Sequence, residues 1–161
     1  MQRGFTLIEL ILVLTLLAVA ASLIVPTLGT FLRGRTLDSE VRRLLALTHA
    51  GQSRAISEGM PMRLWIDEEK GSYGLEQEYT AGMTDARAEE FAVDSGLQVE
   101  VEESASDTVA ARQIPAIRFL PEGIVDESSP RTVRVKDGTG ASFWLVQTEG
   151  RMAYEIHDTN K

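Results

Sequence analysis

The feature that most limits how this chain can fold is its N-terminal apolar run, RGFTLIELILVLTLLAVAASLIVPT, which covers residues 3–27. Residues 10–32 contain no charged side chain. A helix needs about 20 mainly apolar residues to cross a bilayer, and residues 5–24 supply that length only with Glu9 inside the span. The run therefore predicts a hydrophobic helix that is long enough to cross a membrane, with one acid near its start.

Two ordinary interpretations compete for this run. In the first, residues 1–4 are the basic region of a secretory signal, residues 5–17 its apolar region, and Ala-Val-Ala at 18–20 its cleavage site. In the second, the run is an uncleaved transmembrane anchor. Glu9 counts against both, because an acid in the apolar part of a membrane helix costs on the order of 2 to 3 kcal/mol at mid-bilayer.

Glu9 itself indicates a function. The natural partner of a carboxylate in an apolar layer is a cation. Thr6 and Val13 occupy neighbouring positions about one helical turn away, and no Lys or Arg lies at that spacing. We therefore expect a positive group from another molecule to meet this carboxylate.

The string RGFTLIEL resembles the class III signal of type IV pilins and type II secretion pseudopilins. The resemblance rests on a short basic leader, Gly4 before the cleavage point, Phe5 as the new N-terminus and Glu9 four residues later. It implies that a prepilin peptidase removes residues 1–4 and methylates the amine of Phe5. It also implies that Glu9 neutralises the N-terminal amine of a neighbouring subunit, an ion pair that is favourable in the low-dielectric filament core.

Pro26 has two interpretations that the sequence leaves open. In the pilin-like family the stalk helix often bends near this position, because proline removes one backbone hydrogen bond and clashes with the preceding turn. The alternative is that Pro26 marks the end of a transmembrane helix. The resemblance implies the first role, a helix bend.

The same resemblance places the chain in the bacterial inner membrane as a single-pass protein, with its N-terminus in the cytoplasm and its globular domain in the periplasm. The positive-inside rule alone gives the opposite orientation, because Arg3 is the only basic residue before the apolar run and four arginines follow it closely. Those four are Arg33, Arg35, Arg42 and Arg43. We expect the family orientation.

Beyond the apolar run, residues 33–60 keep a helical period. The apolar side chains at this spacing are Leu37, Val41, Leu44 and Leu45, with Ala55 and Ile56 as a weaker continuation toward Gly59 and Pro61. The stripe predicts an amphipathic continuation of the stalk that packs against the protein's own sheet. Gly29 and Gly34 weaken the helix before this stretch, so a loosened or bent segment is expected there.

From residue 62 onward apolar and polar residues alternate, as in strands that bury one face. MRLWID and YGLEQEY, joined by EEKGS, predict a hairpin, and we expect a loop with room for a helical turn at 80–96. Further strands are expected at LQVEVEE, AIRFL, RTVRVKD, ASFWLVQT and RMAYEIH, with a flexible excursion at 104–113. The predicted class is α+β: a type IV pilin-like long N-terminal helix packed on a C-terminal antiparallel sheet or small β-sandwich, which forms a globular domain at 61–161.

Within this domain the sequence resembles the GspH/FimT family. IRFLPEGIVDE at 117–127 contains the F-x-P-x-G turn of that family, TEGRM at 148–152 contains its late G-R, and AGQSRAISEGMPMRLWID resembles its helix-to-strand passage. Residues 80–113 match nothing that we can name. Phe119, Pro121 and Gly123 are interpreted as structural markers, a well-made turn beside a buried aromatic ring.

Composition excludes several classes of site. The chain has a net charge of -8 and no cysteine, so disulfides and thiolate metal sites are absent. His49 and His157 belong to no metal-binding spacing, and DGTG at 137–140 joins two strands, so a hairpin turn is favoured over a phosphate site. The acids at 67–69 and 100–103 are interpreted as solvated faces, with weak calcium binding as the alternative. We expect no enzyme, no cofactor and no metal.

The leading hypothesis is a minor pseudopilin of the H type in a type II secretion system. Its partners would be the prepilin peptidase, the major pseudopilin, other minor pseudopilins and the inner membrane. A minor type IV pilin that acts in pilus assembly or takes up DNA is the alternative. DNA-binding members carry G-R-x-R, whereas here Gly150 and Arg151 precede Met152 and Ala153, and residues 62–161 hold twenty acids against ten basic residues, so no nucleic acid is expected. A secreted enzyme released after Ala20 is a third possibility.

Overall fold

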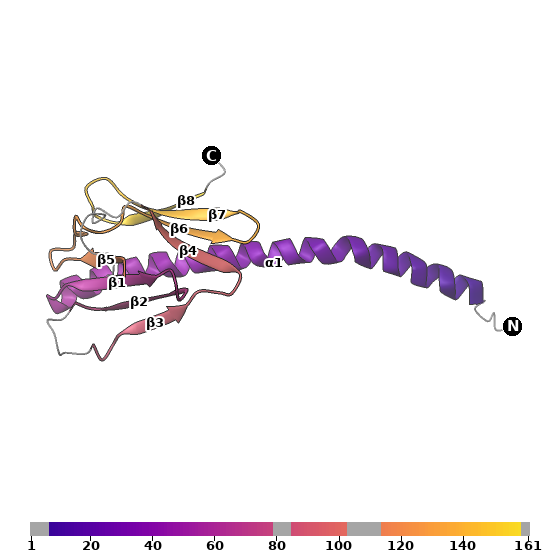
Figure 1. Cartoon of the computed structure of the whole chain (residues 1–161), viewed down its shortest axis with the longest axis horizontal. Helices are drawn as coiled ribbons and strands as arrows, with labels where there is room; N and C mark the ends of the chain where they lie inside the picture. The colour runs from indigo at the N-terminus through magenta and orange to yellow at the C-terminus, as the bar shows by residue number, and fades with distance from the viewer. Residues whose placement is uncertain (1–6, 79–84, 103–113, 159–161) are drawn as a thin grey trace. The chain divides into compact units, whose positions relative to one another are not determined.

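The computed structural model describes residues 7–78, 85–102 and 114–158, with residues 21–34 described by their backbone alone. The chain divides into two compact units, residues 1–35 and residues 36–161. The first unit consists of the start of helix α1, which runs from Leu7 to Glu58 (Figure 1). The sequence predicts a loosened or bent helix around Gly29 and Gly34. The loosening is wrong, since α1 is a continuous α-helix across both glycines. The bend at Pro26 stays a prediction.

The second unit begins with the remainder of α1. The helix ends where Gly59 adopts a φ of 64°, a left-handed conformation that glycine accepts without the cost other residues incur. Pro61 follows two residues later, and a proline cannot continue the helix. The chain then enters the first strand at Met62.

The first sheet has four antiparallel strands in the order β3-β2-β1-β5. Their bounds are β1 Met62–Asp67, β2 Ser72–Gln77, β3 Glu89–Ala92 and β5 Ala116–Phe119. The predicted hairpin is confirmed, since β1 and β2 pair with Leu64 opposite Leu75. The expected loop at 80–96 is wrong in part, because β3 lies within it and pairs with β2.

The second sheet has the order β4-β6-β7-β8 and is also antiparallel. Its strands are β4 Leu97–Glu102, β6 Thr132–Asp137, β7 Ser142–Gln147 and β8 Tyr154–Asp158. All four were predicted from the alternation of apolar and polar residues. The expected excursion at 104–113 lies outside the described residues.

One hydrophobic core joins the helix to both sheets. From α1 it contains Leu37, Val41 and Leu44, all three of them buried as predicted, together with Leu47. The inward positions of the strands complete it, namely Met62, Leu64, Ile66, Tyr73, Leu75, Leu97, Val99, Ile117, Phe119, Val133, Val135, Leu145 and Tyr154. The α+β class, with a helix packed on antiparallel sheets, is therefore confirmed. In the weaker continuation of the apolar stripe, Ala55 is buried in this core as predicted, whereas Ile56 is 56% exposed.

Candidate functional site

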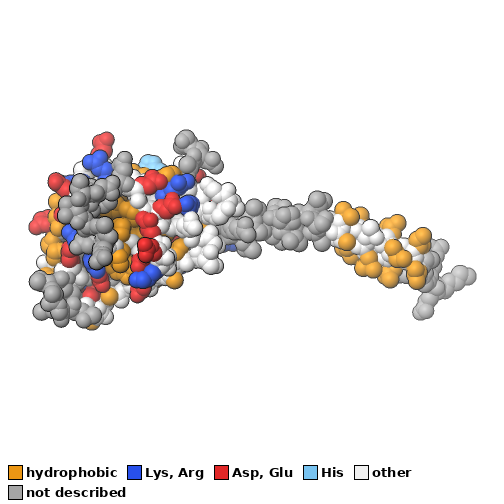
Figure 2. All heavy atoms as spheres, viewed as in Figure 1, with side chains coloured by type: hydrophobic (Ala, Val, Ile, Leu, Met, Phe, Trp, Pro, Cys, Tyr) orange, Lys and Arg blue, Asp and Glu red, His pale blue; other side chains and the backbone are white. Residues whose placement is uncertain are grey.

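The N-terminal part of α1 carries large apolar side chains on every side. Those described are Leu7, Ile8, Leu10, Ile11, Leu12, Val13, Leu14, Leu16, Leu17 and Val19, all of them exposed, with Leu7 reaching 77% (Figure 2). The hydroxyl of Thr15 donates to the carbonyl of Ile11 at 2.8 Å, so this polar side chain is satisfied within the helix. A helix that is apolar all round is usually buried in its working state. Within the described residues, α1 offers no stretch that is apolar over a length sufficient to cross a membrane.

The predicted processing and pairing residues lie at the start of this segment. Gly4 and Phe5 lie outside the described residues. Glu9 lies in the first turn of α1 and is exposed. A carboxylate at this end of a helix interacts favourably with the positive end of the helix dipole. Pro26 lies within α1.

The residues that mark the F-x-P-x-G turn form a structural unit with α1. The ring of Phe119 is 1% exposed, and two of its carbons would lie 2.8 Å from a Cβ placed on Gly51, so the helix approaches the sheet closely at this glycine. Gly123 adopts a φ of 84°, and its N–H donates to the carbonyl of Leu120 at 2.9 Å. The interpretation of Phe119 and Gly123 as structural markers is consistent with these contacts.

The second marker, Gly150-Arg151, forms the turn between β7 and β8. Both residues have a positive φ, 84° for Gly150 and 58° for Arg151. The N–H of Arg151 donates to the carbonyl of Thr148 at 3.1 Å, and the carbonyl of Arg151 accepts from Val125 at 2.9 Å. Its guanidinium lies 2.9 Å from the carboxylate of Glu127. The positive charge of this turn therefore faces an acid of the same chain.

The side-chain amide of Gln52 connects the two marker turns. It donates to the carbonyl of Gly123 at 2.5 Å and to the carbonyl of Met152 at 2.7 Å. Sequence reasoning missed this residue, since no pattern in the sequence relates a glutamine on α1 to two distant turns. One side chain of α1 therefore holds both turns in place.

A buried polar cluster on α1 was also missed. Glu40 is only 3% exposed, accepts a 2.6 Å hydrogen bond from the hydroxyl of Tyr73 and lies 3.2 Å from Arg43. Burial, together with the neighbouring Glu40 carboxylate, raises the pKa of Tyr73. Arg43 in turn lies over the ring of Phe91, 5.6 Å from its centroid. The signal was present in the sequence, because Glu40 lies three residues after Leu37 and so falls on the apolar face.

An ion-pair network fixes the start of the segment that precedes β3. The guanidinium of Arg54 lies 3.0 Å from Asp85 and 3.1 Å from Glu58, and Arg87 lies 3.1 Å from Glu58. The backbone N–H groups of Gln77 and Arg87 donate to the Asp85 carboxylate at 2.9 and 2.8 Å. Burial works against the charged form of Asp85, but these donors outweigh it and lower its pKa. The network is structural: each acid faces an arginine.

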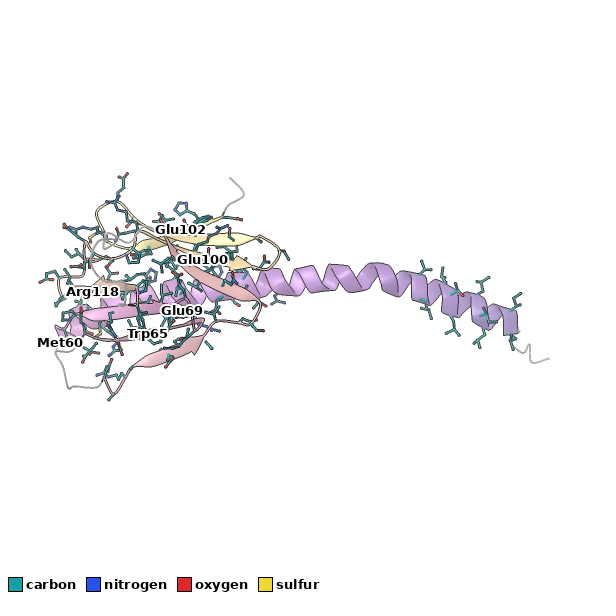
Figure 3. The ribbon with its side chains drawn as sticks, in the orientation of Figure 1. Met60, Trp65, Glu69, Glu100, Glu102 and Arg118 are labelled. Atoms are coloured by element: carbon teal, nitrogen blue, oxygen red, sulfur yellow. The ribbon has the colours of Figure 1, made fainter. Side chains whose placement is uncertain are left out.

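The acidic stretches are ion-paired to a greater extent than predicted. Lys70 lies 3.0 Å from Asp67, and Lys136 and Arg134 on β6 face Glu100 and Glu102 on β4. Figure 3 shows these two glutamates side by side on β4, and Figure 2 shows blue side chains next to red ones on the same face. Glu103 lies outside the described residues.

Glu68 accepts a hydrogen bond from the backbone N–H of Val101 at 2.8 Å, so one acid of the first stretch is attached to the edge of β4. The interpretation of the two stretches as solvated faces is therefore wrong in part, because Lys70 pairs with Asp67 and basic residues of β6 pair with Glu100 and Glu102 across the strands. His49 and His157 are exposed. Among the residues that the structure describes, no group of three or more histidines and acids is arranged to hold a metal ion.

Two family models match this chain. The one described as Type II transport protein GspH matches residues 40–150, and the one described as Prokaryotic N-terminal methylation motif matches residues 1–25. The first covers strands β1 to β7 and the first marker turn, and it ends at Gly150 of the second marker turn. The second covers Gly4, Phe5 and Glu9. No curated protein matches the chain significantly.

Solved structures of pilin-like proteins have the same fold. The minor pseudopilin EpsH from the type 2 secretion system of Vibrio cholerae gives a TM-score of 0.56 at 13% identity, over 78% of this chain and 98% of that one. A second EpsH structure gives 0.53 at 14% identity, over 79% and 96%. The type IV minor pilin FimU of Pseudomonas aeruginosa strain PAO1 gives 0.56 at 13% identity, over 81% and 95%. These likenesses confirm the type IV pilin-like fold.

Proposed function

Because this chain belongs to the family of type II transport protein GspH, we propose that it works as a minor pseudopilin, a structural subunit of the periplasmic filament of a type II secretion system. The observation that carries the proposal is the combination of two family matches on one chain, the N-terminal methylation motif at 1–25 and the GspH domain at 40–150. The activity is assembly. The filament helps to export folded proteins.

The N-terminal segment would supply the assembly surface. A prepilin peptidase cuts after Gly4 and methylates the amine of Phe5. Residues 5–32 then serve first as the membrane anchor and later as the filament core, with a bend at Pro26. Support comes from the exposed apolar side chains of residues 7–20, which need an apolar surrounding in the working protein.

Glu9 is proposed as the residue that selects a neighbouring subunit. Its carboxylate would meet the N-terminal amine of that subunit inside the filament. An ion pair of this kind adds specificity, because a subunit without a matching amine leaves a charge in a low-dielectric core. The proposed partners are the major pseudopilin and other minor pseudopilins.

The proposed location follows from this assembly route. The chain is inserted in the inner membrane with its N-terminus in the cytoplasm. Residues 33–60 continue the stalk helix, and residues 61–161 form the periplasmic domain, which enters the pseudopilus after extraction from the membrane. The support is the prepilin-type N-terminus together with the pilin-like fold.

A minor type IV pilin remains the second candidate. The specific observation in its favour is the FimU structure, whose TM-score of 0.56 equals that of EpsH, so the fold alone does not separate the two functions. The match to the GspH family model favours the secretion filament. Pairing of Arg151 with Glu127 gives no support to DNA uptake.

The decisive experiment replaces Glu9 in the full chain, in cells that contain the complete secretion system. Glu9→Ala should leave membrane insertion intact but reduce co-purification with sheared filaments and reduce secretion. Thr15→Ala is the matched control, because it also removes a polar group from the apolar segment, one that only bonds its own helix. Normal co-assembly and secretion by Glu9→Ala would refute the proposal.

A further inference from the structure

Two exposed apolar side chains lie near Gln52, at the end of the globular unit where α1 finishes. Ile56 is 56% exposed and Met152 is 57% exposed. Gln52 lies one helical turn before Ile56 and donates to the carbonyl of Met152 at 2.7 Å. A Cβ placed on Gly123 would lie 3.0 Å from Cδ1 of Ile56. Gln52, Ile56 and Met152 therefore lie around the buried Gly123, and these four residues are here called the Gln52 patch.

The backbone beneath the Gln52 patch is held rigidly. Gly123 is anchored to α1 by the 2.5 Å hydrogen bond from Gln52. The turn that carries Met152 is closed by a hydrogen bond from the backbone N–H of Thr148 to the carbonyl of Ala153, at 2.9 Å. A second hydrogen bond, from the N–H of Val125 to the carbonyl of Arg151, connects this turn to the neighbouring segment. A surface that is ordered before it binds loses little conformational entropy on binding. The patch has the preorganisation of a docking site.

Three exposed acids lie in the turns that carry the Gln52 patch, and they are here called its rim. Glu122 and Glu149, next in sequence to the two marker glycines, are exposed, and so is Glu127. The one basic side chain of these turns, Arg151, lies 2.9 Å from Glu127. An apolar centre with a charged rim is the usual anatomy of a protein interface. Because like charges would face each other, the same surface of a second copy is a poor partner, and a phosphate backbone is repelled too.

We propose that the Gln52 patch binds a different pilin-like subunit of the same filament, through an apolar side chain of that subunit flanked by lysine or arginine. Ile56 and Met152 contact the apolar group, and the acids of the rim face the basic residues. This inference rests on the proposed function, since it supplies a second contact beyond the one at Glu9. In this proposal the end of α1 is the part of the globular domain that recognises the neighbouring subunit.

Photo-crosslinking in the full-length chain tests this directly. The probes are epitope-tagged copies of the other pilin-like subunits of the same secretion system, made in the same cells. With p-benzoylphenylalanine at position 152, we expect a crosslink to one tagged subunit. Ile56→Lys should lower its yield about tenfold, as for the loss of an important interface side chain. Ile114→Lys is the matched control, because Ile114 is also an exposed isoleucine, at 45%, and lies outside the patch.

A charge variant tests the chemistry of the partner. Glu122→Lys combined with Glu149→Lys should reduce the crosslink, whereas Glu90→Lys, at an exposed acid on β3, should not. Equal yields for Ile56→Lys and Ile114→Lys, an unaltered yield in the rim variant, or a crosslink only to a second copy of this chain would overturn the inference. If Glu9→Ala blocks assembly while Ile56→Lys has no effect, this inference alone fails. If Glu9→Ala assembles normally, the proposed function fails.

Discussion

Gly51 on α1 is the position where one added methyl group tests the packing most sharply. The residue is buried, and a Cβ there would lie 2.8 Å from two ring carbons of Phe119 and 3.0 Å from a methyl group of Leu75. Both neighbours belong to the core, so neither can move aside without disturbing other contacts. Gly51→Ala therefore forces α1 away from the first sheet.

The expected magnitude is a difference between two opposing effects. Alanine is the better helix former by about 1 kcal/mol. An extra methyl group in a filled core typically costs about 1 to 3 kcal/mol. The net expectation is a loss of roughly 1 kcal/mol in the free energy of unfolding. In a Phe119→Leu background the ring is gone, so Gly51→Ala should be neutral or stabilising by up to about 1 kcal/mol.

The assay is urea unfolding of residues 36–161, the unit that contains the whole described core. Four proteins complete the cycle: the parent, each single variant and the double variant. Gly138→Ala is the control, because a Cβ there meets nothing within 4 Å and its φ is not positive. A Gly51→Ala variant that is more stable than the parent, by the same amount with and without the Phe119 ring, would refute the packing argument.

Two further predictions concern the polar clusters. Tyr73→Phe removes the hydroxyl donor of the buried Glu40 carboxylate, so the free energy of unfolding should fall by about 1.5 to 3 kcal/mol; an unchanged urea midpoint would show that the hydrogen bond contributes nothing. The lowered pKa of Asp85 means that its stabilisation is complete above the unfolded pKa of about 4 and is lost as the pH falls through the lower folded value. Hydrogen-exchange protection of the Gln77 and Arg87 amides should fall in that acidic range, and Asp85→Asn should remove this pH dependence; protection that stays constant through it in the parent would contradict the network.

Most of the fold was predictable because local patterns agree with the tertiary structure. Alternation placed Met62, Leu64 and Ile66 on one face of β1, and all three are buried. The strand β3 was missed because Glu89-Glu90-Phe91-Ala92 does not alternate. Its one partly buried side chain, Phe91, packs against the ring of Tyr73 at a centroid distance of 5.9 Å. Tertiary contacts, and not local propensity, make this edge strand.

The contacts around the marker turns could not be derived from sequence patterns. Gln52 reaches Gly123 and Met152, which lie 71 and 100 residues further along the chain. Hydrogen bonds over such separations leave no periodic trace, since they depend on how α1 and the two sheets pack. The exposure of Ile56 was missed for the same reason, since helical spacing alone does not separate it from its buried neighbour Ala55.

The most direct measurement of the central claim is the N-terminal sequence and intact mass of the mature chain isolated from its own cells. A pilin-like assembly route predicts that the chain begins at Phe5 and carries a methyl group on that amine. A chain that retains Met1, or that begins at Ala21 after loss of the apolar leader, would contradict the filament function.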